Sequence, residues 1–216
     1  MSLFGRLKSE NQADWDAYIK HDFVAQLADG SLAKASFKHY LGQDYLFLIH
    51  FARAFALAAY KAESLVDIRQ AAGGLVAIVD LEMDLHVKFC ADWGLSEADM
   101  EALPEAPETM AYTRYVLEKG LSGDLLDLHV ALAPCIIGYA EIGAALQDNI
   151  TGNPYGAWIE MYVSEDYQAV VNAEIEQLDS LLVSRGGEGR FDALAKNFNQ
   201  AIRLEIAFWQ MGLDVK

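Results

Sequence analysis

Hydrophobic side chains recur at three- and four-residue steps along most of the chain. Five stretches show this spacing clearly, at residues 15–27, 37–51, 75–89, 128–142 and 191–209. The period is that of amphipathic helices, in which residues three and four apart share a face, and not that of alternating strands. The pattern therefore predicts a helical protein.

Short polar segments rich in glycine separate these stretches, and such residues end helices and cap the next ones. The sequence shows no hairpin signal and no internal repeat, and the gaps between helices are short. We therefore predict that residues 1–216 form a single domain, an all-α bundle of about seven helices. The predicted breaks are Asp29-Gly30-Ser31, Gly94-Leu95-Ser96-Glu97, Leu121-Ser122-Gly123-Asp124, Gly152-Asn153-Pro154 and Arg185-Gly186-Gly187.

The charge balance excludes some classes of partner. The chain has 216 residues, of which 53% are hydrophobic, and 32 acidic residues against 16 basic ones give a net charge of −16. Phosphate contacts need a basic surface, so direct binding to DNA or RNA is not expected. The same repulsion disfavours an anionic membrane surface.

Cysteine use and hydropathy predict a soluble, cytoplasmic protein. Cys90 and Cys135 are too few for a disulfide framework. The N-terminus has no apolar stretch of signal-peptide length. The most apolar segment, residues 125–150, is interrupted by polar groups such as Asp127 and Glu141, so we do not expect it to span a membrane.

Glu205 is a carboxylate on a predicted core face. It lies three residues after Ile202 and four before Trp209, and so points inward among aromatic residues. Burial without a partner costs free energy and raises the pKa of a carboxyl group, which suits a general acid near neutral pH. The alternative is a structural carboxylate bonded to a neighbouring helix.

Asp44 occupies a similar position, four residues after Tyr40 and four before Leu48. A buried Asp flanked by aromatic residues could accept hydrogen bonds from the NH groups of a flat heterocycle, and Phe47 borders the same stripe. The alternative is a bond to a tyrosine hydroxyl in the core.

Cys135 lies in an apolar helical stretch, with Tyr139 one turn later. A nucleophilic cysteine needs help to form the thiolate, and His129 is six residues away on another face. A buried inert thiol is the alternative for Cys135 and the expectation for Cys90.

Three tyrosines, Tyr112, Tyr139 and Tyr162, fall in apolar stretches. Their hydroxyls need partners in a core and could converge on a polar ligand, although ordinary helix packing explains each one alone.

No metal or other cofactor is predicted. No histidine has an acidic residue three positions before it, there is no Cys/His zinc spacing, and no glycine-rich phosphate loop is present. Glu82 and His86 share a helix face, but one such pair is a weak site.

Six segments in order resemble the TenA family, also called thiaminase II or aminopyrimidine aminohydrolase. The resemblance runs from His21 to Met211. The segments are residues 37–47 (FKHYLGQDYLF), 82–86 (EMDLH), 111–113 (AYT), 134–139 (PCIIGY), 153–162 (NPY followed by WIEMY) and 205–209 (Glu205 followed by Phe208-Trp209).

The resemblance implies a haem-oxygenase-like helical bundle, assembled as a homotetramer. It also implies hydrolysis at the 5-methylene group of 4-amino-2-methylpyrimidines, with release of ammonia or thiazole. The product would be 4-amino-5-hydroxymethyl-2-methylpyrimidine, for thiamin salvage. No cofactor is implied.

The resemblance also implies residue roles. Cys135 would be the nucleophile, which places the chain in the Cys-bearing branch, and Glu205 would protonate or hold ring N1. The substrate-binding residues would be Asp44, at N3 and the 4-amino group, Phe47 and Tyr112, walling the ring, and Tyr139 and Tyr162, supplying hydroxyls. Many relatives have tyrosine where this chain has Phe47, so stacking is kept and a hydroxyl is lost.

Two other functions stay open. An oxidase of the same fold, like the PQQ synthase, would want several histidines in its pocket, and here His50 and His86 are expected to face inward. A non-catalytic pyrimidine-binding regulatory protein would retain the ligand without turnover. Release of ammonia separates an aminohydrolase from both.

Overall fold

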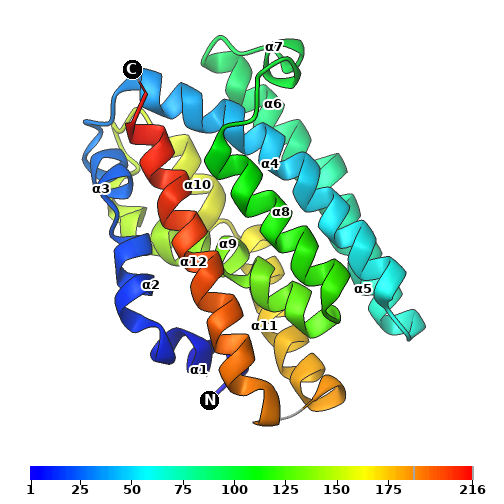
Figure 1. Cartoon of the computed structure of the whole chain (residues 1–216). Coiled ribbons are helices and arrows are strands. Elements are labelled where there is room, and N and C mark those ends of the chain that lie inside the picture. The colour runs from blue at the N-terminus through cyan, green and yellow to red at the C-terminus, as the bar shows by residue number, and fades with distance from the viewer. Residues whose placement is uncertain (187, 216) are drawn as a thin grey trace. The chain divides into compact units, whose positions relative to one another are not determined.

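The computed structural model describes residues 1–186 and 188–215, and within them the protein is all-α, with no strand. Figure 1 shows the elements, which in chain order are α1 (Leu3–Glu10), α2 (Gln12–Ile19), α3 (Asp22–Asp29), α4 (Lys34–Lys61), α5 (Leu65–Val76), the π-helical η1 (Ala77–Glu82), α6 (Met83–Asp92), α7 (Glu97–Glu101), α8 (Pro107–Ser122), α9 (Leu125–Leu146), the 3₁₀ turn η2 (Gln147–Asn149), α10 (Gly156–Val163), α11 (Glu165–Arg185), the 3₁₀ turn η3 (Glu188–Arg190) and α12 (Phe191–Leu213).

The described residues contain twelve α-helices, more than the seven or so expected, because local caps divide some hydrophobic stretches. The stretch 15–27 is one example. The His21 ring nitrogen accepts a hydrogen bond from the backbone N–H of Phe23 at 3.2 Å, and this N-cap starts α3 as a separate helix. At the predicted break after α11, Gly186 follows the helix as expected, and Gly187 lies outside the described residues.

The contacts group the chain into two compact units. The first comprises Met1–Leu32 and His129–Gln210, and the second comprises Ala33–Leu128 and Met211–Lys216. The single-domain organisation stays a prediction.

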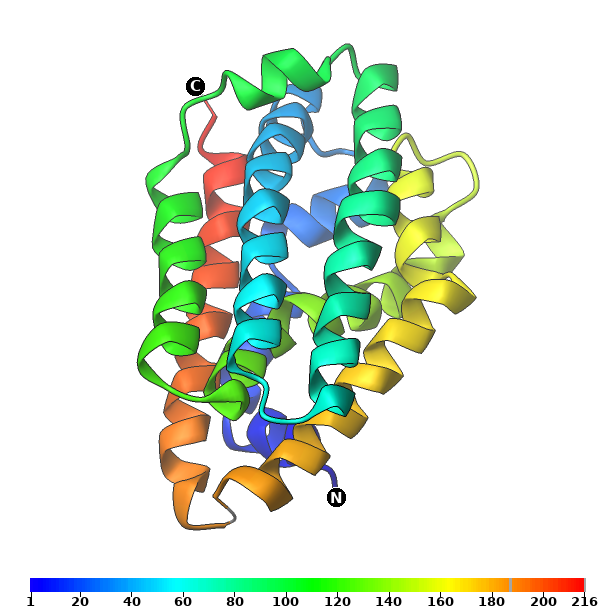
Figure 2. The same cartoon turned by 90° about the vertical axis from the view of Figure 1, so that its right-hand side faces the viewer.

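In the second unit, the 28-residue helix α4 packs against α5, η1, α6, α7 and α8. Figure 2 shows α4 between α8 on one side and the α5–η1–α6 segment on the other. The α4 side chains are buried on most sides because neighbours cover the helix nearly all round. At its C-terminal end, Lys61 Nζ donates to the carbonyl oxygen of Gly120 at 2.7 Å, which caps the end of α8.

Helix α9 is apolar and long, and by length and composition the segment Leu125–Asn149 could cross a membrane, with a mean hydropathy of 1.5. The polar residues of this segment therefore do not decide the matter by themselves. However, 83% of the most apolar window is buried within the protein, which is what a core helix requires. A cytoplasmic location stays a prediction.

Within the first unit, α9 approaches α2 closely at Gly138. A Cβ atom added there would lie 2.3 Å from a ring carbon of Tyr18, and the Tyr18 hydroxyl donates to the carbonyl oxygen of Pro134 at 3.3 Å. Only glycine leaves room for this ring, which packs across the helix turn that carries Cys135.

We predict that Gly138→Ala lowers the free energy of unfolding by about 1 to 3 kcal/mol, because the methyl group forces the Tyr18 ring to move. Urea unfolding followed by circular dichroism measures the change. Gly73→Ala is the matched control. No atom lies within 4 Å of a Cβ built at Gly73 in α5. Alanine favours a helix more than glycine does, so this variant should raise the free energy of unfolding by about 0.5 to 1 kcal/mol. Equal effects at both positions would contradict the close packing at Gly138.

Candidate functional site

Four of the seven predicted site residues belong to the first unit. Cys135 and Tyr139 lie on α9, Tyr162 on α10 and Glu205 on α12. Glu205 is 1% exposed and both tyrosines are 4% exposed, so these three side chains are buried, as the helical period predicts, while Cys135 is partly exposed. Their chemical roles stay predictions.

The two tyrosines belong to an aromatic cluster built from α9, α10 and α12. The ring of Tyr139 lies 4.9 Å from that of Tyr162 and 5.2 Å from that of Trp209, measured between centroids. Trp158 completes the cluster, 4.6 Å from Tyr162 and 5.9 Å from Tyr139. Trp209 follows Glu205 by one helix turn, so the α12 face that carries the buried carboxyl group packs against Tyr139.

The backbone on either side of Cys135 is held by tyrosine hydroxyls from other helices. Tyr18 donates to the carbonyl oxygen of Pro134, and Tyr167 on α11 donates to that of Ile136 at 3.1 Å. Pro134 lies inside α9 and has no N–H to donate to the preceding turn, and the two tyrosine hydroxyls add tertiary hydrogen bonds to this part of the helix. Cys135, a partly exposed residue, therefore lies between two backbone positions that tertiary hydrogen bonds hold.

The other three predicted residues, Asp44 and Phe47 on α4 and Tyr112 on α8, belong to the second unit. Phe47 and Tyr112 pack together, with ring centroids 5.0 Å apart, and Asp44 precedes Phe47 by three residues on the same helix. All three are at least 92% buried. Phe47 and Tyr112 are therefore in contact, and Asp44 lies one turn before Phe47 on α4.

Two polar neighbours lie close to the Oδ2 atom of Asp44. The Tyr40 hydroxyl donates a hydrogen bond to Oδ2 at 3.4 Å, and His86 Nδ1 lies 3.6 Å from the same atom. The bond from Tyr40 is the structural alternative expected from the sequence. Burial raises the pKa of Asp44 to about 7. The hydrogen bond from Tyr40 lowers this pKa, but by less than burial raises it. Burial lowers the pKa of His86.

The charge of Asp44 acts on two further titratable groups, Glu82 and Cys90, and the sequence did not link either of them to Asp44. Burial, and then the charge of Asp44, raise the pKa of Glu82 to about 8 and that of Cys90 to about 12. Cys90 is therefore the inert thiol that was expected. Glu82 and His86 had been noted for sharing a face, but as a weak metal pair. No group of three or more ligating side chains that could hold a metal occurs in the described part of the chain.

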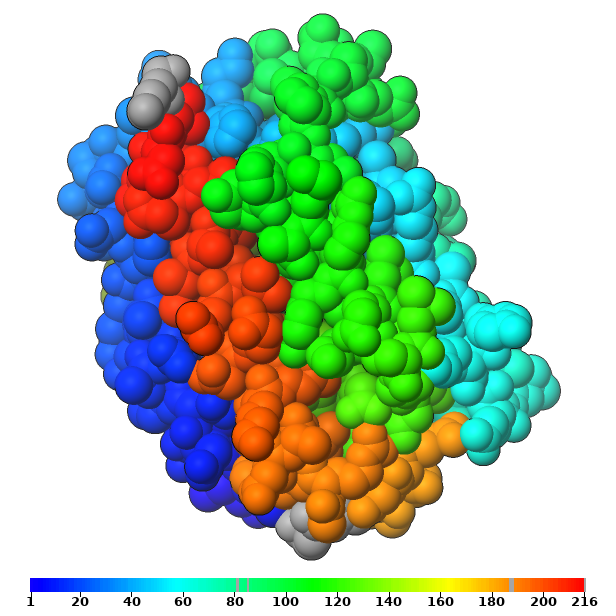
Figure 3. All heavy atoms as spheres, viewed as in Figure 1, coloured from blue at the N-terminus to red at the C-terminus, as the bar shows by residue number. Residues whose placement is uncertain are grey.

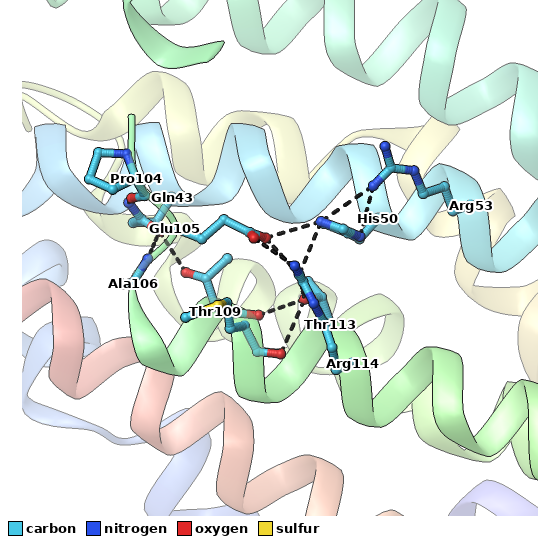
Figure 4. A network of polar contacts seen from close by, with 10 residues as sticks. Gln43, His50, Arg53, Pro104, Glu105, Ala106, Thr109, Thr113 and Arg114 are labelled. Atoms are coloured by element: carbon cyan, nitrogen blue, oxygen red, sulfur yellow. Dashed lines mark hydrogen bonds and ion pairs between the residues drawn. The ribbon is translucent and has the colours of Figure 1, made fainter. Parts of the chain in front are cut away.

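A polar network beside Phe47 joins α4 to α8 (Figure 4). Arg114 donates to both carboxylate oxygens of Glu105 at 2.7 Å, and His50 Nε2 lies 3.0 Å from Glu105 Oε1. Hydrogen bonds from Arg114 lower the pKa of Glu105, so this carboxylate stays charged. The adjoining space, lined by Phe47 and His50 among others, has no room for a water molecule. The network therefore ties α4 to α8.

The histidines follow the expected pattern only in part, since His86 is buried as expected at 6% exposed. His50 is engaged by Glu105 and Arg114, while His129, which was not expected to face inward, is 2% exposed. Its Nδ1 atom lies 2.9 Å from Glu174 Oε1, and Glu174 is also buried. The partner is on α11, so the helical period of α9 alone did not reveal this pair.

These features place the chain among all-α proteins with buried carboxyl groups and a reachable thiol. The chain belongs to the TENA/THI-4/PQQC family, whose model matches residues 9–215. The expected family and all-α fold are therefore confirmed.

Three relatives illustrate the similarity. A Haemophilus influenzae protein named only as uncharacterized is 39% identical, over 99% of this chain and 100% of its own. An aminopyrimidine aminohydrolase of Halalkalibacterium halodurans is 37% identical, over 99% of this chain and 96% of its own. The crystal structure of a protein described as a TenA family transcription regulator, from Silicibacter sp. TM1040, superposes with a TM-score of 0.95 at 45% identity, covering 99% and 97% of the two chains.

The raised pKa of Asp44 predicts a pH-dependent stability. Between about pH 4 and pH 7 the folded protein keeps a proton that the unfolded chain has lost, so the free energy of unfolding falls as pH rises through this window. Asp44→Asn removes the effect. The free energy of unfolding of this variant relative to wild type should therefore be about 2 to 4 kcal/mol higher at pH 8 than at pH 4. Urea unfolding at both pH values measures this. The exposed Asp84→Asn serves as control, and a pH-independent effect of Asp44→Asn would contradict the assignment.

Proposed function

We propose that this protein is an aminopyrimidine aminohydrolase of the thiaminase II type. It would hydrolyse the 5-methylene substituent of 4-amino-2-methylpyrimidines and release 4-amino-5-hydroxymethyl-2-methylpyrimidine for thiamin salvage. The observation that carries the proposal is the 37% identity to an aminopyrimidine aminohydrolase along 99% of this chain and 96% of that protein. Further relatives with the same name, from Helicobacter pylori and Bacillus subtilis, are 29% and 30% identical.

In this proposal Cys135 is the nucleophile. Its thiolate adds to a ring carbon of the pyrimidine while Glu205 protonates or holds ring N1, which makes the ring electrophilic. The 5-methylene substituent then leaves, as ammonia from an aminomethyl group or as thiazole from thiamin. Water adds to the exocyclic carbon, and the thiolate departs. The partly exposed thiol and the 1% exposed carboxyl group support these roles.

The remaining residues bind the ring in this proposal. Asp44 pairs with N3 and the 4-amino group, and Phe47 and Tyr112, whose rings already pack together, wall the heterocycle. Tyr139 and Tyr162 supply hydroxyls near Glu205 and the leaving group, which their place in the α9–α10–α12 cluster supports. Phe47 carries no hydroxyl, so it contributes stacking alone.

The proposal further makes the protein a homo-oligomer, as the family resemblance implies. An apolar stripe supports this, running along α5 into η1 at helical spacing through Leu65, Ile68, Val76 and Val79, which are 39–58% exposed. Figure 3 shows the α4–α5 region, in cyan, at the molecular surface. Exposed apolar patches of this kind mark interaction sites.

We predict that Cys135→Ser abolishes release of ammonia from 4-amino-5-aminomethyl-2-methylpyrimidine, because the hydroxyl is a far weaker nucleophile than the thiolate. A coupled ammonia assay measures turnover, and circular dichroism checks that the fold is kept. Cys90→Ser is the control at the other cysteine. Wild-type rates in Cys135→Ser would refute the nucleophile.

Two further variants separate the roles of the carboxyl groups in the same assay. Glu205→Ala should reduce kcat strongly, whereas Asp44→Ala should mainly raise KM. If wild-type protein binds the pyrimidine without releasing ammonia, it is a binding protein and not a hydrolase. A panel that includes thiamin identifies the preferred leaving group.

For the oligomer, we predict that light scattering after size-exclusion chromatography gives a multiple of the 23.9 kDa chain, four chains in the family form. Val76→Glu should lower this mass, because it places a charge in the apolar stripe. Val183→Glu changes an equally apolar side chain that is 85% exposed on α11, and it should leave the mass unchanged. A monomer in wild type would refute the assembly.

A further inference from the structure

Helices α4 and α8 carry three of the residues that are proposed to bind the pyrimidine, and different contacts fix their positions. Asp44 and Phe47 both lie on α4, so the helix itself sets the distance between them. Tyr112 lies on α8, so its distance from Phe47 depends on the register of one helix against the other. The contacts between α4 and α8 therefore decide where the Tyr112 ring stands.

Gln43 on α4 makes the contacts that fix the start of α8, and its side chain is 2% exposed. Its Oε1 atom accepts hydrogen bonds from the backbone N–H of Ala106 and from the Thr109 hydroxyl, both at 2.8 Å. Its Nε2 atom donates to the carbonyl oxygen of Pro104 at 3.0 Å. A backbone N–H can only donate and a carbonyl oxygen can only accept, so these partners fix the orientation of the amide. We call Gln43 and its three partners the amide clamp.

The amide clamp replaces the cap that α8 lacks. Ala106 is the N-cap residue of α8, and its side chain makes no capping hydrogen bond. Gln43 accepts from the N–H of Ala106, as an N3 glutamine does in a capping box, but it does so from another helix. Thr109 is three residues before Tyr112, and Gln43 is four before Phe47, so the clamp lies one turn from the packed rings on each helix.

A second polar contact holds the same loop on the other side of Phe47 (Figure 4). His50, three residues after Phe47, has its Nε2 atom 3.0 Å from Glu105 Oε1. Glu105 also accepts from Arg114 of α8 at 2.7 Å. Because Glu105 belongs to the loop segment 104–106 that the amide clamp binds, this segment is tied to α4 both before and after Phe47. The register of α8 on α4 is therefore set on both sides of this ring.

We propose that Gln43 is a positioning residue, which acts with Thr109 to hold the Tyr112 ring against Phe47. The inference rests on the proposed function and deepens it, since it names the group that keeps the wall for a flat heterocycle in place. A wall that is already ordered loses less conformational freedom when the pyrimidine binds, so the clamp strengthens binding. Gln43 touches neither the substrate nor the reacting atoms in this scheme, and its effect passes through Tyr112.

The first test compares kcat and KM for 4-amino-5-aminomethyl-2-methylpyrimidine. Thr109→Val removes the hydroxyl and nearly keeps the shape. It should raise KM about 3- to 5-fold and leave kcat within about 2-fold of wild type, because binding of the ring is what weakens. Thr109→Ser keeps the hydroxyl and should restore the wild-type KM. Gln43→Leu removes the whole clamp and should raise KM about 10-fold.

Lys61→Met is the matched control, because it breaks a hydrogen bond between the same two helices far from the rings. Lys61 Nζ donates to the carbonyl oxygen of Gly120 at 2.7 Å, near the C-terminal end of both α4 and α8. This variant should lower the free energy of unfolding and leave KM unchanged. An equal rise of KM in Lys61→Met and Thr109→Val would show a general loss of helix packing and would overturn the positioning role.

A double-mutant cycle supplies a readout that a merely structural role would not move. In a Tyr112→Ala background, Thr109→Val should change KM by less than about 1.5-fold, because the ring that the clamp positions is gone. If the two substitutions instead raise KM independently, so that their effects multiply, Gln43 and Thr109 do not act through Tyr112.

A further measurement needs no substrate. Proton NMR of the ligand-free protein, with labelled tyrosine and phenylalanine and with Tyr112→Phe for assignment, detects the nuclear Overhauser effect between the Tyr112 and Phe47 rings. We expect a strong signal in wild type, Thr109→Ser and Lys61→Met. The signal should weaken in Thr109→Val and Gln43→Leu, because the rings are no longer held together.

The outcomes separate this inference from the proposed function. If wild type releases no ammonia, the proposed function fails, and the ring signal in the Gln43 and Thr109 variants still decides whether the clamp holds Tyr112 against Phe47. If wild type is active but Thr109→Val and Gln43→Leu leave both KM and the ring signal unchanged, the inference alone is overturned.

Discussion

The cost of ionising a carboxyl group on the buried face of a helix dominates the chemistry of this protein. Asp44 is 8% exposed and Glu205 is 1% exposed, and each follows the hydrophobic period of a long helix. Water cannot stabilise a charge at such positions, so neighbouring groups decide whether the proton stays. For Asp44, burial favours the neutral form and the hydrogen bond from the Tyr40 hydroxyl favours the carboxylate, while His86 Nδ1 lies 3.6 Å from Oδ2.

Close helix packing supplies the rigidity that such groups need. In the first unit the aromatic cluster of α9, α10 and α12 surrounds the turns that carry Tyr139 and Glu205. Glycine at position 138 lets Tyr18 cross α9, and hydroxyls of Tyr18 and Tyr167 hold the backbone on both sides of Cys135. A thiol on a helix that also contains a proline is thereby fixed by tertiary contacts and not by the helix alone.

Much of this could be anticipated from single helix periods. The stripe 37–51 predicts that Asp44 faces inward with Tyr40 and Phe47, and the stripe 191–209 does the same for Glu205. Cys90 at the end of its helix was expected to be an inert thiol, and the pKa of about 12 agrees. The number of helices was underestimated because caps such as that of His21 depend on backbone geometry at one residue. For residues 125–150, hydropathy alone could not distinguish a core helix from a span, because it does not tell whether neighbouring helices cover an apolar surface.

The sequence by itself determined the all-α class, the family, and which polar groups lie on core faces, because helical period and local motifs are properties of neighbouring residues. Only the tertiary structure decided how those groups are paired. His129 with Glu174 and Arg114 with Glu105 each join residues on different segments, and Leu41 orients His86 from another helix. The charge of Asp44 reaches Glu82 for the same reason, since η1 packs against α4. Such distances depend on helix packing, which no single helix period contains.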